Sequence, residues 1–187
     1  MTRIIAGSAR GRRLRTPPGE ATRPTSDRVR EALFSALESE LGSLSGLRFL
    51  DLYAGSGAVG LEAVSRGAEA VTSVESDRRT ARLVQDNAAA LGFHQVDVLA
   101  QPVARVVAQP PGAPYDVVFA DPPYPLENAQ VESVLTRLVA NGWLVAGALL
   151  VLERSARSVE PAWPPGLNRE REKKYGETVL WYVRADV

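Results

Sequence analysis

The sequence predicts an α/β fold, in which a doubly wound, seven-stranded and mainly parallel sheet is closed by a C-terminal antiparallel hairpin and preceded by a small basic N-terminal extension. Three observations predict it. Short apolar runs of strand length alternate with segments of helical spacing from residue 47 to residue 152. Glycine, asparagine and aspartate mark the connections between them. Residues 167–183 then break this alternation with two strand patterns around a single turn.

The chain has the size and composition of one globular domain. Its 187 residues are 45% hydrophobic and 24% charged, which is typical of a soluble globular protein. We expect a basic arm over residues 1–24 and a single globular domain over residues 25–187. Glycines and prolines punctuate the arm, which predicts a loop or a short hairpin. Thr25 or Ser26 is then expected to cap a helix that ends at Gly42.

The remaining elements follow in order along the chain. Strands are expected where apolar residues cluster, at 47–52, 70–74, 96–99, 115–120 and 148–152, and in the closing hairpin at 167–174 and 177–183. Helices are expected over 59–66, from an Asp77 cap to Leu91, and along an apolar stripe from Val131 to Val139 that stops at Asn141.

Several classes of site and location are excluded by composition. The chain has no cysteine, which removes disulfides, thiolate metal sites and cysteine nucleophiles. The single histidine, His94, lies in a polar turn where a solvated role is expected, and no metal site is predicted. Chemistry must therefore use carboxylates, backbone groups, aromatic rings or a cofactor. The chain has no apolar run of about 18 residues and no signal-peptide pattern, which indicates a cytoplasmic protein without a membrane span.

Positive charge is concentrated at the N-terminus. The formal net charge is zero, yet the first 30 residues hold eight arginines against two acids. A local basic arm is typical of proteins with a phosphate-rich partner, although a solvated, disordered tail is an equal alternative for the arginines alone. The candidate contacts with such a partner are six of these arginines and two lysines of the closing hairpin, for which an ordinary solvated role is about as plausible: Arg10, Arg12, Arg13, Arg23, Arg28, Arg30, Lys173 and Lys174.

A glycine-rich turn follows the first strand of the sheet. Residues 55–60 fit the pattern GxGxxG, which by itself also fits a nicotinamide cofactor. Asp51 precedes the glycines, where a carboxylate would repel a pyrophosphate but attract the amino group of a methionine moiety. Glu75 ends the next strand, where it can accept hydrogen bonds from both ribose hydroxyls. A helix-capping role for Asp51 and an exposed strand end for Glu75 are the alternatives.

Together, Asp51 and Glu75 resemble the first two motifs of class I methyltransferases, which have a Rossmann-like fold and use S-adenosylmethionine. In that family the end of the third strand usually carries an acid that meets the adenine, and Gln101 is the nearest match by position. The candidate cofactor-binding residues are Asp51, Tyr53, Gly55, Ser56, Gly57, Glu75, Ser76 and Gln101.

The most specific motif is Asp121, Pro122, Pro123 and Tyr124, which directly follows a buried strand. An exocyclic base amine is a poor nucleophile because its lone pair is conjugated with the ring. A carboxylate and a proline carbonyl that accept its two N–H bonds would hold the nitrogen with its lone pair toward a sulfonium methyl. Tyr124 offers a ring for stacking a flipped base. The alternative is a proline-rich turn with Asp121 as a helix cap; the motif itself also serves methylation of adenine, cytosine, guanine and glutamine amides.

The whole chain resembles the RsmD family of bacterial small-subunit ribosomal RNA guanine-N2 methyltransferases. The resemblance runs through residues 3–7, 11–14, 51–60, 121–124 and 174–178, and is strongest over residues 23–34. It implies that Asp121 and Tyr124 bind a guanine of 16S rRNA, that the arm covers the cofactor and meets RNA, and that the substrate is the small ribosomal subunit or its assembly intermediate. A monomer is the default expectation for this family.

Four other functions stay open at this stage. A nicotinamide-dependent oxidoreductase would explain the glycines but gives residues 121–124 no role. A protein glutamine-amide methyltransferase shares that motif but leaves the arginine arm unused. A DNA amino-methyltransferase normally carries an added recognition domain, for which this chain has no room. A non-catalytic rRNA-binding assembly factor is disfavoured by the intact Asp51, Glu75 and Asp121.

Overall fold

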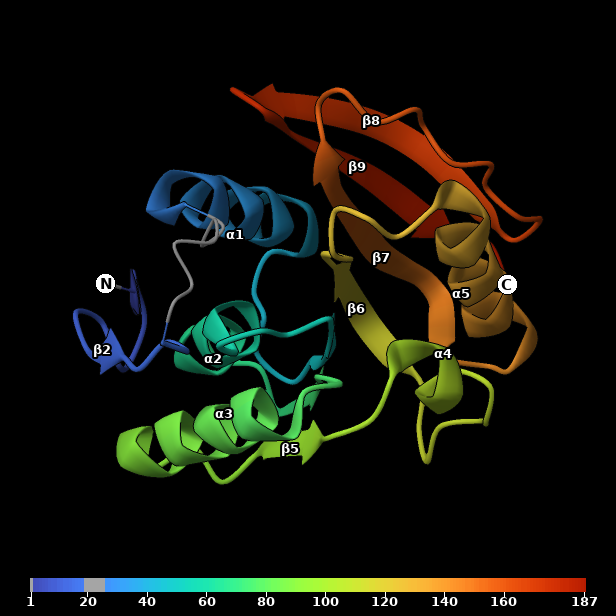
Figure 1. Ribbon diagram of the computed structural model, residues 1–187. Coiled ribbons are helices and arrows are strands. Elements are labelled where there is room, and N and C mark those ends of the chain that lie inside the picture. Colours follow the sequence, from blue (N-terminus) through green and yellow to red (C-terminus); the bar gives the residue numbers. More distant parts are fainter. Residues whose placement is uncertain (1, 19–25) are drawn as a thin grey trace.

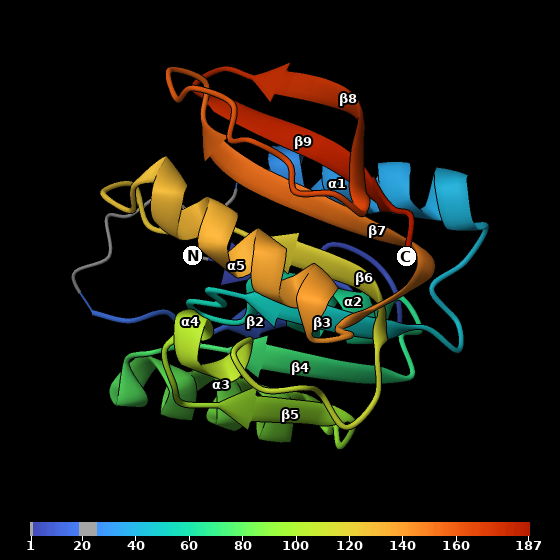
Figure 2. The same cartoon turned by 90° about the vertical axis from the view of Figure 1, so that its right-hand side faces the viewer.

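The computed structural model describes residues 2–18 and 26–187, and it confirms the predicted seven-stranded sheet (Figures 1 and 2). In spatial order the strands are β5 (Val96–Leu99), β4 (Ala70–Val74), β3 (Arg48–Leu52), β6 (Tyr115–Ala120), β7 (Leu144–Ser155), β9 (Thr178–Ala185) and β8 (Leu167–Tyr175). The first five strands in this order, β5, β4, β3, β6 and β7, are parallel to one another. The hairpin of β8 and β9 is antiparallel and adds to the sheet beside β7.

Helices cover both faces of this sheet (Figure 1). Helices α1 (Asp27–Leu41), α2 (Ala58–Ser65) and α3 (Arg78–Leu91) lie on one face, while α4 (Val103–Val106) and α5 (Asn128–Ala140) lie on the other. Because side chains alternate along a strand, Phe49 of β3 packs into the core under α1 and α2, whereas Leu50 packs into the core under α4 and α5. The result is the doubly wound architecture that the sequence predicts.

Local capping signals set most helix ends as expected. Of the two candidate caps for α1, the Oγ of Ser26 accepts the backbone N–H of Val29 at 3.2 Å. Asp77 caps α3 by accepting the backbone N–H of Thr80 at 2.8 Å. Gly42 ends α1 with a positive φ of 77°, a conformation that glycine adopts without steric cost.

Three features differ from the sequence expectations. Strand β7 spans Leu144–Ser155 rather than 148–152, because β6 and β9 pair with it from opposite sides and thereby bury its polar end. Helix α4, a single turn after Pro102, was not expected. Strand β9 continues two residues past 183, where Ala185 pairs with Leu167.

The described part of the N-terminal extension forms the expected short hairpin. Strand β1 (Thr2–Arg3) pairs antiparallel with β2 (Arg13–Leu14). Ile4 and Leu14 are buried in a small apolar cluster with Leu61 of α2 and Ala88 of α3. This hairpin therefore packs directly against the helices that follow the glycine-rich turn.

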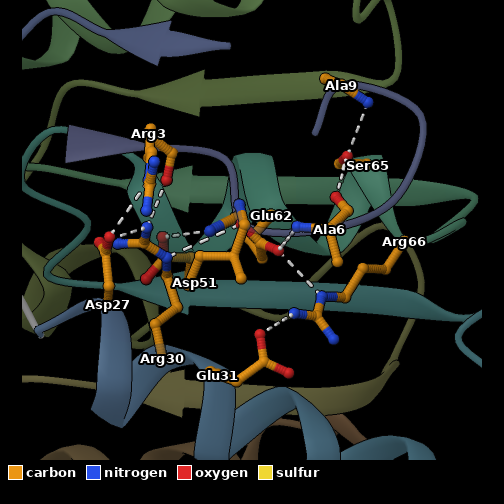
Figure 3. A network of polar contacts seen from close by, with 12 residues as sticks. Arg3, Ala6, Ala9, Asp27, Arg30, Glu31, Asp51, Glu62, Ser65 and Arg66 are labelled. Atoms are coloured by element: carbon orange, nitrogen blue, oxygen red, sulfur yellow. Dashed lines mark hydrogen bonds and ion pairs between the residues drawn. The ribbon is translucent and has the colours of Figure 1, made fainter. Parts of the chain in front are cut away.

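Buried polar groups of α2 fasten the hairpin to the domain (Figure 3). The carboxylate of Glu62, fully buried, accepts the backbone N–H groups of Ile5 at 2.8 Å and Ala6 at 3.0 Å. A Cβ at Gly7 would lie 1.9 Å from the backbone oxygen of Ser65, so only glycine fits at this crossing. These contacts with α2 use backbone groups of the hairpin and do not involve its arginine side chains.

Candidate active site

The candidate site lies at the carboxyl edge of the parallel strands. The chain runs from β3 outward to β4 and β5, and then returns to place β6 on the other side of β3. The strand order therefore reverses at β3 and β6, and ligands of open α/β sheets bind beyond the carboxyl ends of the strands at such a point. Asp51 lies near the end of β3, and Asp121 directly follows β6.

The glycine-rich turn leaves β3 through an unusual backbone. Tyr53 has a φ of 60°, the only positive φ among the described residues other than glycine, and this conformation costs on the order of 1 kcal/mol. Gly55 and Gly57 also have positive φ values. A Cβ at Gly57 would lie 2.6 Å from Cγ1 of Val84, so α3 packs directly on the turn. At Gly55 a Cβ would meet no atom within 4 Å, so that side of the turn is open.

Asp51 is a buried carboxylate at the centre of the site. Its Oδ2 accepts the backbone N–H of Gly60 in the first turn of α2 at 3.0 Å, although the N-cap residue of this helix is Gly57. Burial raises the pKa of Asp51 to about 8; the bond from Gly60 opposes this shift, and the negative charges of Asp121 and Glu75 add to it. These three carboxylates therefore act on one another across the site. Such an arrangement favours a cationic group and disfavours a pyrophosphate.

The other candidate cofactor residues follow the neighbouring strands. Glu75 comes directly after β4, and its Oε2 accepts the backbone N–H of Asp77 at 3.4 Å. Ser76 is exposed beside it, and Gln101 is exposed beyond β5, the strand next to β4. The turn and the ends of β4 and β5 thus present these residues along one edge of the sheet.

The Asp121–Tyr124 segment emerges from β6 next to the turn of β3. The backbone N–H of Asp121 donates to the carbonyl of Leu52 at 3.4 Å. Pro122 is buried, while Tyr124 is 69% exposed. The carbonyl of Pro123 accepts the backbone N–H of Leu126 at 2.9 Å, which closes a turn with Tyr124 at its tip. Helix α5 begins only at Asn128 and is capped by Glu127. The alternative role of Asp121 as the cap of this helix is therefore wrong.

Two buried residues near the site escaped the sequence reasoning. Arg154, near the end of β7, donates to carbonyls of the Pro123–Leu126 turn. Asn87 of α3 accepts the backbone N–H of Arg15 at 2.9 Å and donates to the carbonyl of Ser56 at 3.3 Å, so it joins the arm to the glycine-rich turn. For Asn87 the available signal was a polar residue on an apolar helix face, whereas Arg154 lies beyond the predicted strand 148–152, where the sequence carries no such signal.

The basic residues divide into exposed and buried groups. Arg10, Arg13 and Arg28 are exposed, as are Lys173 and Lys174 on the edge strand β8. Arg12 is exposed but donates to the carbonyl of Ala90 at 3.0 Å. Arg23 lies outside the described residues. A cleft of about 390 Å³ between the hairpin and α1 is lined by Arg3, Ile4, Ile5, Arg10, Gly11, Asp27, Arg28 and Glu31.

Arg30 corrects one prediction. Its side chain is fully buried and donates to the carbonyl of Arg3 and to Oδ1 of Asp27, and its Nε lies 3.7 Å from Oε2 of Glu62 (Figure 3). Burial lowers the pKa of Arg30, which the carboxylates of Glu62 and Asp27 oppose. A buried guanidinium offers no surface to RNA, so this residue supports the hairpin instead of contacting a ligand.

Comparison with known proteins places this geometry in a family. The family model described as conserved hypothetical protein 95 matches residues 2–184. The chain belongs to this family. Ribosomal RNA small subunit methyltransferase D of Escherichia coli K12 is 38% identical over 175 residues, which cover 94% of this chain and 85% of that protein. The resemblance drawn from the sequence is thereby confirmed.

Solved structures of methyltransferases share the family's architecture. The putative methyltransferase yhhF from Escherichia coli superposes with a TM-score of 0.87 at 34% identity, covering 99% of this chain and 98% of that one. Magnesium protoporphyrin IX methyltransferase from Synechocystis PCC 6803, solved with bound SAM, has a TM-score of 0.66 at 15% identity, over 85% of this chain and 79% of that one. The second likeness shows the fold alone, and that fold is the predicted class I methyltransferase fold.

Proposed function

We propose that this protein is an S-adenosylmethionine-dependent methyltransferase that methylates the exocyclic N2 amine of a guanine in 16S rRNA, within the small ribosomal subunit or its assembly intermediate. The observation that carries the proposal is the meeting of Asp51, Glu75 and Asp121 at one edge of the sheet, with Pro122, Pro123 and Tyr124 attached to the last of them. The methyltransferase relatives, among them the rRNA methyltransferase of Escherichia coli, support the reaction class and the substrate.

The residues present fit S-adenosylmethionine better than a dinucleotide. The carboxylates of Glu75 and Asp121, together with Asp51, which a bound cation would favour in its ionised form, suit the ammonium and sulfonium charges of that cofactor, whereas they would repel the pyrophosphate of NAD. The open side of Gly55 leaves room for a ligand against the backbone of the turn. Asp51 would hold the ammonium group, Glu75 the ribose hydroxyls, and Tyr53, Ser56, Gly57, Ser76 and Gln101 would line the rest of the cofactor.

The chain's own groups then prepare the target amine. When bound, the cofactor supplies an electrophilic methyl group on sulfur. The carboxylate of Asp121 and the carbonyl of Pro122 accept the two N–H bonds of the guanine amine and orient its lone pair. The Pro123 carbonyl is not the acceptor, since Leu126 and Arg154 already donate to it. The ring of Tyr124 stacks on the base, which contributes about 1–3 kcal/mol.

The bond changes balance without an added reactant. The bound cofactor would give its methyl group to the amine nitrogen held by Asp121 and Pro122 and would keep the electron pair of the broken carbon–sulfur bond. The nitrogen then carries one proton too many. Asp121 is the nearest carboxylate in the motif and accepts that proton before it passes to solvent.

The exposed arginines of the hairpin supply a separate contact with the substrate. Arg10 of the hairpin and Arg28 of α1 line the cleft between these two elements, and Arg12 and Arg13 of the hairpin are exposed; RNA phosphates would be attracted to this positive charge. For Arg23, Lys173 and Lys174 a phosphate contact remains a proposal from the sequence.

No helix in the described ranges has the length and hydropathy needed to cross a bilayer.

We also propose a monomer that works in the cytoplasm, where ribosomal subunits assemble, and that needs no metal. Within residues 2–18 and 26–187, no three His, Asp or Glu side chains are grouped so that they could hold a metal ion.

Transfer of labelled methyl to a panel of acceptors tests this function. The acceptors are small ribosomal subunits lacking the modification, naked 16S rRNA, duplex DNA and a glutamine-containing peptide. Label in the subunits and not in the DNA or peptide is expected. Label in the peptide alone would refute the RNA substrate and indicate a protein-amide methyltransferase. If the protein binds S-adenosylmethionine but labels none of the acceptors, the result would favour a non-catalytic assembly factor.

A further inference from the structure

The Pro123–Leu126 turn has too few backbone donors to be stabilised by its own backbone alone. Residues 122, 123 and 125 are prolines, so the five residues from Pro122 to Leu126 contain only two backbone N–H donors. At most two of its five carbonyls can therefore be paired within the segment, and the others need donors from outside it. One of the two N–H groups, that of Leu126, closes the turn on the carbonyl of Pro123 at 2.9 Å.

Arg154 supplies donors from the neighbouring strand. The register of β6 against β7 pairs Ala120 with Leu152, so Arg154 lies two residues beyond the last pair, alongside the segment that follows β6. Its Nη2 donates to the carbonyl of Leu126 at 2.6 Å, and its Nη1 approaches the carbonyl of Pro123 at 3.4 Å. The guanidinium thus spans both ends of the turn.

Burial makes these contacts effective. Arg154 is 8% exposed, so water does not compete well for its donors or for the two carbonyls. The fixed fork of an arginine can meet two carbonyls at once, which the single ammonium of a lysine does less well. The side chain of Leu126 packs on the apolar core at one end of the turn, but Tyr124 at its tip is 69% exposed. The position of the Tyr124 ring is therefore set by the turn.

Resting on the proposed role of residues 121–124 in binding the target base, we propose that Arg154 is a positioning residue. It holds the Pro123–Leu126 turn in the conformation that presents the Tyr124 ring and leaves the Pro122 carbonyl to the target amine. Arg154 contacts neither the base nor the reacting atoms in this proposal. The same guanidinium lies near the phenol of Tyr53, whose pKa is raised to about 12 by burial against the opposing charge of Arg154.

Substitution of Arg154 separates positioning from general stability. Arg154→Ala is expected to lower turnover of small subunits roughly 10- to 100-fold, the range for one hydrogen bond from a charged donor, because the contact with the Pro123 carbonyl at 3.4 Å adds little, with the Kd for S-adenosylmethionine changed less than about twofold. Arg154→Lys should recover part of the turnover. Guanidinium ion at millimolar concentration should restore part of the activity of Arg154→Ala by entering the vacated site.

Arg184→Ala is the matched control. Arg184 of β9 also donates to a backbone carbonyl, that of Gly147 at 3.1 Å, but near the opposite end of β7 from Arg154. Its loss should lower thermal stability without a change in turnover of the folded protein and without rescue by guanidinium. Turnover of Arg154→Ala within twofold of the wild type, or a loss that matches its unfolded fraction and is not rescued, would overturn the proposal.

Hydrogen exchange gives a readout that does not depend on activity. Exchange of the Tyr124 and Leu126 amides should become faster in Arg154→Ala and stay unchanged in Arg184→Ala. Unchanged exchange in Arg154→Ala refutes the positioning role even if the wild type proves inactive on RNA. Faster exchange together with an inactive wild type would instead support the turn contact and refute the proposed function.

Discussion

Replacing Asp51 with asparagine is expected to stabilise the ligand-free protein while weakening its cofactor site. Asparagine keeps the shape and an oxygen that can accept the Gly60 N–H, which Asp51 accepts at 3.0 Å. It removes the carboxyl group of Asp51, a residue that is 1% exposed and whose ionised form faces the negative charges of Asp121 and Glu75. Buried ligand sites of this kind commonly trade stability for function.

The size and sign of the effect follow from the pKa of Asp51. It rises from 3.8 to about 8 in the folded protein, because burial disfavours the carboxylate. Between these two values the folded chain binds more protons than the unfolded chain, so this group's contribution to stability is greatest below pH 4 and is lost as the pH rises toward 8. A shift of about four units corresponds to an upper bound of about 5 kcal/mol at pH 8.

Thermal and urea unfolding at several pH values measure this contribution. Asp51→Asn should raise Tm by at least about 3 °C at pH 8, where 1 kcal/mol corresponds to about 2–4 °C for a chain of this size, and the gain should shrink toward zero at pH 4. Titration calorimetry should show affinity for S-adenosylmethionine lowered by about tenfold or more, since the ammonium loses its charged partner. A destabilised variant at pH 8, or a gain that does not vary with pH, refutes the reasoning.

Four further outcomes are expected. Binding of S-adenosylmethionine to the wild type at pH 7 should release protons, because the ammonium favours the ionised form of Asp51; calorimetry in buffers of different ionisation enthalpy detects this, and buffer-independent heats would contradict it. Asp121→Ala should lower methyl transfer at least about 10²-fold while the cofactor Kd changes less than about twofold, and normal turnover would exclude its catalytic role. Glu62→Ala should cost about 3–5 kcal/mol in urea unfolding, because it removes the one fully buried carboxylate beside Arg30 and the acceptor of the Ile5 and Ala6 N–H groups, and a loss below about 1 kcal/mol would show that other contacts hold the hairpin. Arg10→Gln with Arg13→Gln should reduce the slope of log K against log salt for RNA binding by about 1.4, whereas an unchanged slope would place the phosphates elsewhere.

Sequence patterns identified the elements whose signals are local. The predicted strands at 70–74, 96–99 and 115–120 coincide with β4, β5 and β6. β4 and β6 are buried along most of their length, and such strands read as near-continuous apolar segments, whereas β5 is a half-buried edge strand. Asp77 and Gly42 bound their helices as expected, since capping depends on a few neighbouring residues. The carboxylates of the site were found because they follow such strands.

Features that depend on contacts between distant segments were not visible in the sequence. Arg30 looks like one more arginine of a basic arm, and only the packing of α1 against α2 shows that it meets Glu62. Arg154 lies in the polar end of β7, which a local pattern assigns to a loop, while pairing with β9 buries it. Helix α4 is a single turn, too short to carry a periodic signal.

The identity of the methylated nucleoside tests the central claim most directly. Small subunits that lack the modification are incubated with S-adenosylmethionine and either the wild type or Asp121→Ala, and the rRNA is digested to nucleosides for mass spectrometry. The account predicts N2-methylguanosine with the wild type and its loss with Asp121→Ala. A methyl group on another base, or equal N2-methylguanosine with both proteins, would contradict it.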